Sequence, residues 1–208
     1  GVAAIMAVLE SKDISHPKIE ALFTIDEETG MTGALNLSNS ILTGNILLNL
    51  DTEEDDEICI GCAGGVDITM HREYKLVDPS EDEIFVRVLL NGLTGGHSGA
   101  EIHKGLGNSN KILFEIIASI NTIFQIKIVD INGGGLRNAI PRESSLTLSF
   151  SKSHLDEFND YIKKSSIQYS GKFVKTDPNF NLESENLDIK APSLSYSDTV
   201  DLITSLNQ

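Results

Sequence analysis

The chain has 208 residues, enough for one large domain or two small ones, and a formal net charge of -15. This charge argues against nucleic acid and anionic membranes as partners, because both attract clustered Lys and Arg. No apolar run reaches the roughly 18 to 20 residues of a membrane span, and we recognise no secretory leader. We therefore expect a cytoplasmic protein with no membrane contact.

The chain contains two cysteines, Cys59 and Cys62. Two cysteines make no disulfide framework, which agrees with a reducing cytoplasm. Their spacing would suit a redox or zinc site, but there is no second pair. The surrounding residues alternate as in a strand, so we interpret both cysteines as structural.

Residues 1–10 are predicted to form a packed helix. They begin without an initiator Met and without a capping residue. We therefore expect the chain to be an internal fragment of a longer polypeptide.

Two buried strands are predicted next, at residues 18–25 and 45–50, with a short helix at 33–40 between them. Both runs are short and apolar, and they end in charged residues or glycine. Alternation of strand and helix is typical of a parallel α/β sheet with helices packed on it.

Carboxylates follow both predicted strands: Glu27 and Glu28 come after the first, and Asp51 ends the second. Ligands collect at the carboxyl ends of the strands in an open α/β sheet. Carboxylate oxygens suit divalent metals, so these residues are candidate metal ligands. A solvated turn remains the alternative for the glutamate pair taken alone.

The acidic run at residues 53–57 is interpreted as a hinge between a first domain, 1–57, and a second, 58–208. The second domain is predicted to be an α+β two-layer lid with a mostly antiparallel sheet. Its predicted elements are an antiparallel hairpin of strands 66–76 and 84–90, a helix at 108–123, strands at 126–131 and 144–150, a helix at 154–165, a strand near Phe173 and a helix at 197–206.

Two glycine-rich loops in the second domain carry candidate binding residues. His97 follows Gly95 and Gly96, and a histidine there could donate a hydrogen bond to an oxyanion or a carboxylate. Arg137 and Asn138 follow three glycines, and the fork of an arginine suits a carboxylate. An incidental surface histidine and an asparagine that satisfies its own loop remain open alternatives.

Five motifs occur in a fixed order over residues 24–142. They are Thr24-x-x-Glu-Glu-x-Gly-Met-x-Gly-Ala34, Asn49-x-Asp-x-Glu-Glu54, Gly61-Cys-Ala-Gly-Gly65, Gly95-Gly-His-Ser-Gly-x-x-Ile-His103 and Leu136-Arg-Asn-Ala-Ile-Pro-Arg142. In this combination the chain resembles the Xaa-His dipeptidase (aminoacyl-histidine, or cytosolic non-specific, dipeptidase) branch of the di-zinc metallopeptidases.

The resemblance implies a role for each candidate. Glu27 matches the general base, Glu28 a ligand of one zinc ion and Asp51 a ligand of the other. A carboxylate that is not a ligand is needed to take a proton from the attacking water. His97 and Asn138 match residues that hold the oxyanion or the C-terminal carboxylate of the dipeptide, and the fork of Arg137 suits the same carboxylate.

The family's remaining ligands are a His-x-Asp motif well upstream of the glutamate pair, a bridging Asp a few residues before Gly1 and a His near the C-terminus, and none of these is found at a matching position among the 208 residues. We therefore expect the full-length parent to hydrolyse dipeptides such as carnosine. The chain alone is expected neither to do so nor to hold zinc tightly. The resemblance also implies a homodimer formed through the lid.

Two other functions remain open. The chain could belong to an N-acyl amino acid deacylase or carboxypeptidase of the same fold family. It could also be a non-catalytic, lid-type dimerisation module. The Gly61–Gly65 and Leu136–Arg142 motifs favour the dipeptidase branch by resemblance.

Overall fold

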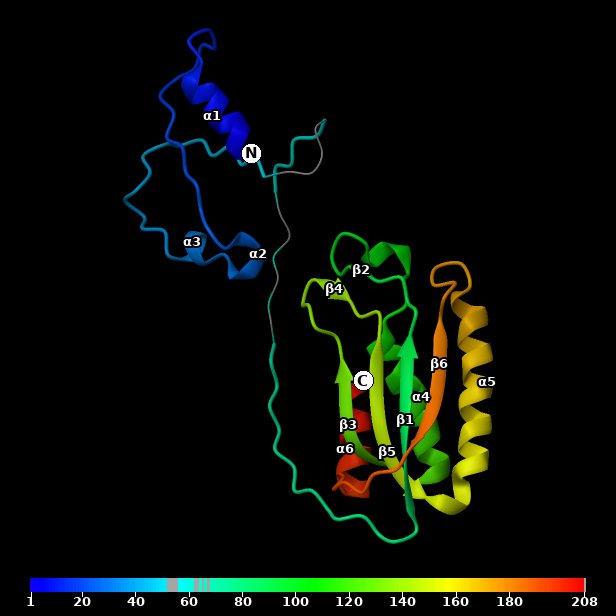
Figure 1. Ribbon diagram of the computed structural model, residues 1–208. Coiled ribbons are helices and arrows are strands. Elements are labelled where there is room, and N and C mark those ends of the chain that lie inside the picture. Colours follow the sequence, from blue (N-terminus) through cyan, green and yellow to red (C-terminus); the bar gives the residue numbers. More distant parts are fainter. Residues whose placement is uncertain (52–55, 62–63, 65, 67, 208) are drawn as a thin grey trace. The chain divides into compact units, whose positions relative to one another are not determined.

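The computed structural model describes residues 1–51, 56–61, 64, 66 and 68–207. The chain divides into two compact units, Gly1–Ile68 and Thr69–Gln208. Each has its own architecture (Figure 1). The predicted acidic hinge and the Gly61–Gly65 motif lie partly outside the described residues, and Cys62 lies wholly outside them.

The first unit contains one longer helix, α1 (Val2–Glu10), and two single-turn helices, α2 (Glu27–Gly30) and α3 (Thr32–Leu35). The helix predicted at 1–10 is therefore confirmed, but it is not packed as predicted, since none of its residues is buried. The helix predicted at 33–40 is reduced to one turn that begins earlier. None of the described residues of this unit is buried. Phe23, Ile25 and Leu47 are 48%, 68% and 80% exposed, so the described part of the unit forms no apolar core of its own.

The buried strands predicted at 18–25 and 45–50 are absent: among the described residues of the first unit, none belongs to a strand. The apolar pattern is that of a parallel strand, but such a strand needs hydrogen-bonded neighbours and helices on both faces. The described part of this unit supplies neither. The side chain of Glu20 in the first segment instead contacts the residues just before the second, accepting hydrogen bonds from the backbone N–H groups of Thr43 (2.6 Å) and Gly44 (3.3 Å).

The second unit is a two-layer α+β fold, as predicted (Figure 1). Its four-stranded sheet has the order β3-β5-β1-β6, and all neighbouring strands are antiparallel. The strands are β1 (Glu83–Asn91), β3 (Lys127–Gly133), β5 (Ser144–Ser151) and β6 (Asn181–Leu187). The helices are α4 (Ser109–Phe124), α5 (Leu155–Phe173) and α6 (Tyr196–Leu206).

Alternation along the central strand β1 determines which face of the sheet is covered. Val86, Val88 and Leu90 are fully buried in the main apolar cluster, whereas Arg87 between them is exposed and pairs with Glu185 at 3.1 Å. The helices contribute the other side of this cluster: Ile112, Leu113, Ile116, Ile117 and Ile120 from α4, Phe158 and Ile162 from α5, and Ile203 from α6. The 3.6-residue period of α4 thus places one apolar stripe on the sheet.

Two predicted features of the second unit are wrong. The segment 66–76 forms no hairpin with β1, which pairs instead with β5 and β6; the described part of this segment is irregular up to the single bridge from Val77 to Ser193. Phe173 lies in the last turn of α5, not in a strand. There its ring stacks with that of Tyr169, one helical turn earlier, and with that of Phe180. Phe173 is therefore used for packing at the end of the helix.

Candidate functional site

Two loops of the second unit meet at one end of the sheet. β2 (Gly96–His97) pairs with β4 (Ala139–Ile140), placing His97 opposite Ala139. The N–H of Ser98 donates to the carbonyl oxygen of Asn138 at 2.8 Å, and its hydroxyl donates to the carbonyl oxygen of Arg137 at 3.3 Å. The structure therefore brings together His97, Arg137 and Asn138, which the sequence singled out separately.

Hydrogen bonds fix the orientation of the His97 ring. Its Nδ1 accepts the backbone N–H groups of Gly99 and Ala100, both at 3.0 Å. An acceptor nitrogen carries no proton, so the neutral ring has its proton on Nε2. The side chain is exposed, and Nε2–H is left as a donor toward a bound molecule.

Glu101 holds the backbone of the same loop. Its carboxylate accepts the N–H of His97 at 2.8 Å and forms an ion pair with Lys104. The hydrogen bond from Lys104, followed by that from the His97 N–H, keeps the pKa of Glu101 below its ordinary value. Glu101 therefore remains an ionised acceptor at neutral pH.

A hollow of about 680 Å³ lies beside the paired loops, and its lining includes Gly96, Leu136, Ala139 and Arg142. The stem of Arg142 crosses Gly95: a Cβ on Gly95 would lie 2.4 Å from both Cγ and Cδ of Arg142. Gly95 also has a φ of +71°, which side-chain-bearing residues rarely adopt. A glycine is therefore required for the arginine to lie against this loop.

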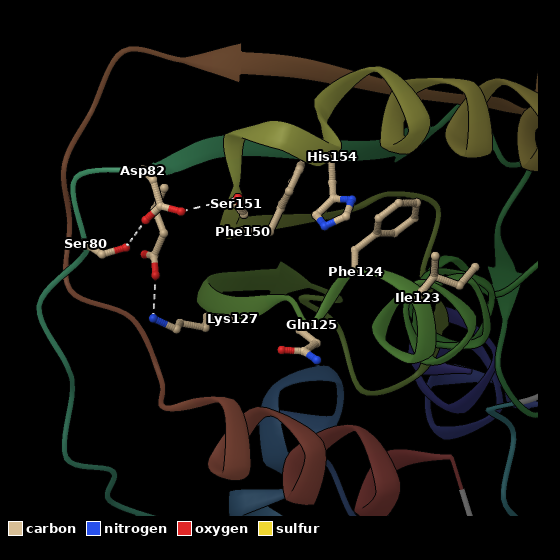
Figure 2. A pocket seen from close by; sticks show the side chains of 10 residues that line it. Ser80, Asp82, Ile123, Phe124, Gln125, Lys127, Phe150, Ser151 and His154 are labelled. Atoms are coloured by element: carbon tan, nitrogen blue, oxygen red, sulfur yellow. Dashed lines mark hydrogen bonds and ion pairs between the residues drawn. The ribbon is translucent and has the colours of Figure 1, made fainter.

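A second hollow, of about 330 Å³, lies at the opposite end of the sheet, where β1 begins (Figure 2). Its charged side chains Asp82, Glu83 and Lys127 pair within the protein, although the buried Oε2 of Glu83 has no hydrogen-bond partner among the described residues. Asp82 accepts hydrogen bonds from Ser80 at 2.8 Å and from Ser151 at 3.3 Å, and Lys127 forms an ion pair with Glu83. The groups that line this hollow therefore support the strand ends, and the candidate site lies at the other end of the sheet.

The candidate metal-binding and catalytic residues belong to the first unit. Glu27 and Glu28 form the first turn of α2, directly after Asp26 in the left-handed conformation, and not the end of a strand as predicted. Asp51 follows the extended segment 45–50, and its N–H donates to the side chain of Asn49 at 3.0 Å. All three carboxylates are exposed.

Carboxylate oxygens are suitable zinc ligands, so Glu28 and Asp51 have the right chemistry. Among the described residues, however, no group of three or more His, Cys, Asp or Glu side chains could hold a metal ion. A protein zinc site takes about three to four side-chain ligands, so each of these two carboxylates would need further ligands to hold a zinc ion.

Comparison with known proteins identifies relatives of the whole chain. Residues 88–166, which include His97, Arg137 and Asn138, match the family model described as the peptidase dimerisation domain. The cytosol non-specific dipeptidase of Escherichia coli (strain K12) is 44% identical over 158 residues, covering 75% of this chain. The crystal structure of aminoacylhistidine dipeptidase from Vibrio alginolyticus matches 99% of this chain, with a TM-score of 0.77 and 36% identity. The chain is similar to the Xaa-His dipeptidases.

The resemblance seen in the five motifs is thereby confirmed. The chain spans 32% of the length of the Escherichia coli relative and 42% of the length of the Vibrio structure. Among the described residues, no helix is long and apolar enough to cross a membrane.

The sequence did not single out Ser98, Glu101 or Asp177, although all three hold the loop that carries His97. Ser98 and Glu101 form hydrogen bonds with backbone groups, and the pattern of side chains in the sequence does not predict such bonds. Asp177 lies in Thr176-Asp-Pro178, a combination typical of turns, and this is the only signal that could have pointed to it.

Proposed function

We propose that the full-length protein carrying this chain is a metal-dependent dipeptidase. The observation that carries the proposal is the pairing of the His97 loop with the Arg137–Asn138 loop, in a chain 36% identical to an aminoacylhistidine dipeptidase over 99% of its length. The Nε2–H of His97 and the side chains of Arg137 and Asn138 would bind the carboxylate or the developing oxyanion of a dipeptide.

Glu27 is proposed as the general base and Glu28 and Asp51 as zinc ligands, with the remaining ligands supplied from outside this chain. When bound, a pair of zinc ions would polarise the peptide carbonyl and acidify water. The chain's own contribution is an exposed glutamate, Glu27, adjacent to the ligand Glu28 and able to accept a proton. The apolar residues at 18–25 and 45–50 would pair as strands of a parallel sheet in the complete catalytic domain.

Carnosine and an N-acetyl amino acid distinguish the dipeptidase from the deacylase. We expect the full-length protein to hydrolyse carnosine and other dipeptides, to lose this activity with a chelator and to regain it with Zn²⁺. Preferential hydrolysis of the N-acetyl amino acid would instead support the deacylase. No hydrolysis of either substrate by a zinc-loaded, folded preparation would support the non-catalytic module.

We further propose that the protein is a homodimer formed through its second unit, because residues 88–166 match a peptidase dimerisation domain. Light scattering on the full-length protein should give the mass of two chains, and a monomeric mass at micromolar concentration would contradict this. The name of the Escherichia coli relative also supports a cytoplasmic location.

A further inference from the structure

The loop that carries His97 is closed at its base by one buried carboxylate, that of Asp177. Oδ1 accepts the N–H of Thr94 at 2.9 Å, and Oδ2 accepts the N–H of Gly107, also at 2.9 Å. Thr94 and Gly107 are the two ends of the segment in which His97 lies. The Thr94 hydroxyl adds a hydrogen bond of 2.7 Å to the carbonyl oxygen of Thr176.

Asp177 is itself held firmly in the turn between α5 and β6. Its N–H donates to the carbonyl oxygen of Phe173 at 2.8 Å, and its carbonyl oxygen accepts the N–H of Phe180 at 3.0 Å. The rings of Tyr169, Phe173 and Phe180 stack with centroids 6.3 to 6.5 Å apart. The turn therefore gives the carboxylate a fixed position.

The Asp177 carboxyl group is ionised, so its two oxygens can accept the two hydrogen bonds at the same time. The residue is fully buried, and burial raises the pKa of its carboxyl group. Hydrogen bonds from Thr94, Thr176 and Gly107 outweigh burial and bring the pKa below its ordinary value. The group therefore stays ionised at neutral pH, with both oxygens as acceptors.

We propose that Asp177 is a positioning residue for the dipeptidase reaction: it binds both ends of the 94–107 loop and so holds His97 at the substrate. This inference rests on the proposed function, in which His97 contacts the substrate. Displacement of a substrate-binding group by about 1 Å can lower a rate on the order of 100-fold, so the base of the loop affects activity without touching the reacting atoms.

Asp177→Asn is the most direct variant because it is nearly isosteric. Asparagine has one acceptor oxygen, so its NH₂ group would face either the Thr94 N–H or the Gly107 N–H. Both groups are donors, so no hydrogen bond could form on that side. One end of the loop would be released. Thr94→Val is a milder second variant, since it keeps the backbone N–H that donates to Asp177, removes the hydroxyl bond to Thr176 and lies at an exposed position.

The test is a double-mutant cycle in the full-length protein with carnosine as substrate. We expect Asp177→Asn to lower kcat/KM by about tenfold or more, and Thr94→Val to lower it less. In a His97→Ala background, each should lower kcat/KM by less than about twofold, because the group that they position is gone. Hydrogen exchange should be faster at Thr94 and Gly107 in Asp177→Asn.

Ile162→Val is the matched control for a general loss of stability. Ile162 is buried on α5, in the same helix that leads to Asp177, and its side chain belongs to the main apolar cluster. We expect it to leave kcat/KM and exchange at Thr94 and Gly107 unchanged. A variant that acts only by lowering the stability of the fold should change kcat/KM by the same factor whether residue 97 is His or Ala.

The inference is wrong if Asp177→Asn lowers kcat/KM by the same factor with His97 and with Ala at position 97. It is also wrong if kcat/KM is unchanged although hydrogen exchange is faster, or if hydrogen exchange at Thr94 and Gly107 is unchanged. If His97→Ala alone leaves kcat/KM unchanged, the assignment of His97 in the proposed function is wrong. Exchange at the two amides then decides separately whether Asp177 closes the loop.

Discussion

The backbone N–H of Ser98 donates to the carbonyl oxygen of Asn138 at 2.8 Å. This bond continues the short β2–β4 ladder, in which His97 lies opposite Ala139. Two glycine-rich loops that are far apart in the sequence therefore form one surface. Its position at one end of the sheet, next to a hollow of about 680 Å³, makes it the binding part of the proposed site.

Glu27→Gln should abolish most of the dipeptidase activity of the full-length protein. A positioned general base typically contributes on the order of 10² to 10⁴ in rate, so we expect kcat to fall by at least about 100-fold. Asp26→Asn is the control, because asparagine tolerates the left-handed backbone that Asp26 adopts. Near-normal turnover of Glu27→Gln would show that the base lies elsewhere.

Gly92→Ala should destabilise the second unit strongly. Gly92 has a φ of +76°, and a Cβ there would lie 1.9 Å from the carbonyl oxygen of Asn179. The strained backbone alone costs about 1 to 3 kcal/mol, and the contact with Asn179 adds to it. Urea unfolding of the chain measures the loss.

Gly171→Ala is the contrasting variant in the same unit. Gly171 lies within α5, and apart from its chain neighbours and the backbone of the same helix no heavy atom would come within 4 Å of an added Cβ. Alanine should therefore stabilise the unit by about 0.5 to 1 kcal/mol, through the higher helix propensity of alanine. Equal effects of the two substitutions would contradict the backbone assigned to Gly92.

Glu20 should make the first unit sensitive to acid. Hydrogen bonds from the Thr43 side chain and backbone lower the pKa of Glu20 to about 2, from an ordinary value of 4.5. Because the folded pKa is depressed, the stabilisation is present above pH 4.5 and is lost as the pH falls toward 2. An NMR titration of the Glu20 carboxyl carbon should follow this shift.

Thr43→Val provides the control for this titration, since it removes the hydroxyl donor and keeps the backbone N–H. The midpoint of Glu20 should then move up toward its ordinary value. A midpoint near 4.5 in the unmodified chain would contradict the Glu20–Thr43 contact.

Tyr169 should ionise later than an ordinary tyrosine. Burial, followed by the hydrogen bond to Glu115 at 3.0 Å, raises the pKa of Tyr169 to about 12. Since the folded state favours the neutral phenol, its stabilisation is present below about pH 10 and is lost as the pH rises through 12. A spectrophotometric titration of the four tyrosines should contain a late transition that Tyr169→Phe removes.

Local patterns predicted much of the second unit. The helical spacing from Ile112 to Ile120 predicted α4, and α4 buries that stripe. Strand β6 was missed because its sequence, Asn-Leu-Glu-Ser-Glu-Asn-Leu, is mostly polar and only Leu182 is buried. An edge strand can be polar, since backbone hydrogen bonds to β1 hold it in place.

The sequence by itself determined the helices α1, α4, α5 and α6, the strands β1, β3 and β5, the acidic charge, the five motifs and the candidate residues Glu27, Glu28, Asp51, His97, Arg137 and Asn138. Tertiary structure alone decided that the His97 loop meets the Asn138 loop and that Asp177 closes its base. The physical reason is that helices and strands arise from local periodicity, which side chains encode. Each contact between loops uses a backbone N–H or carbonyl group on at least one side, and these groups are the same in almost every residue and leave no pattern in the sequence.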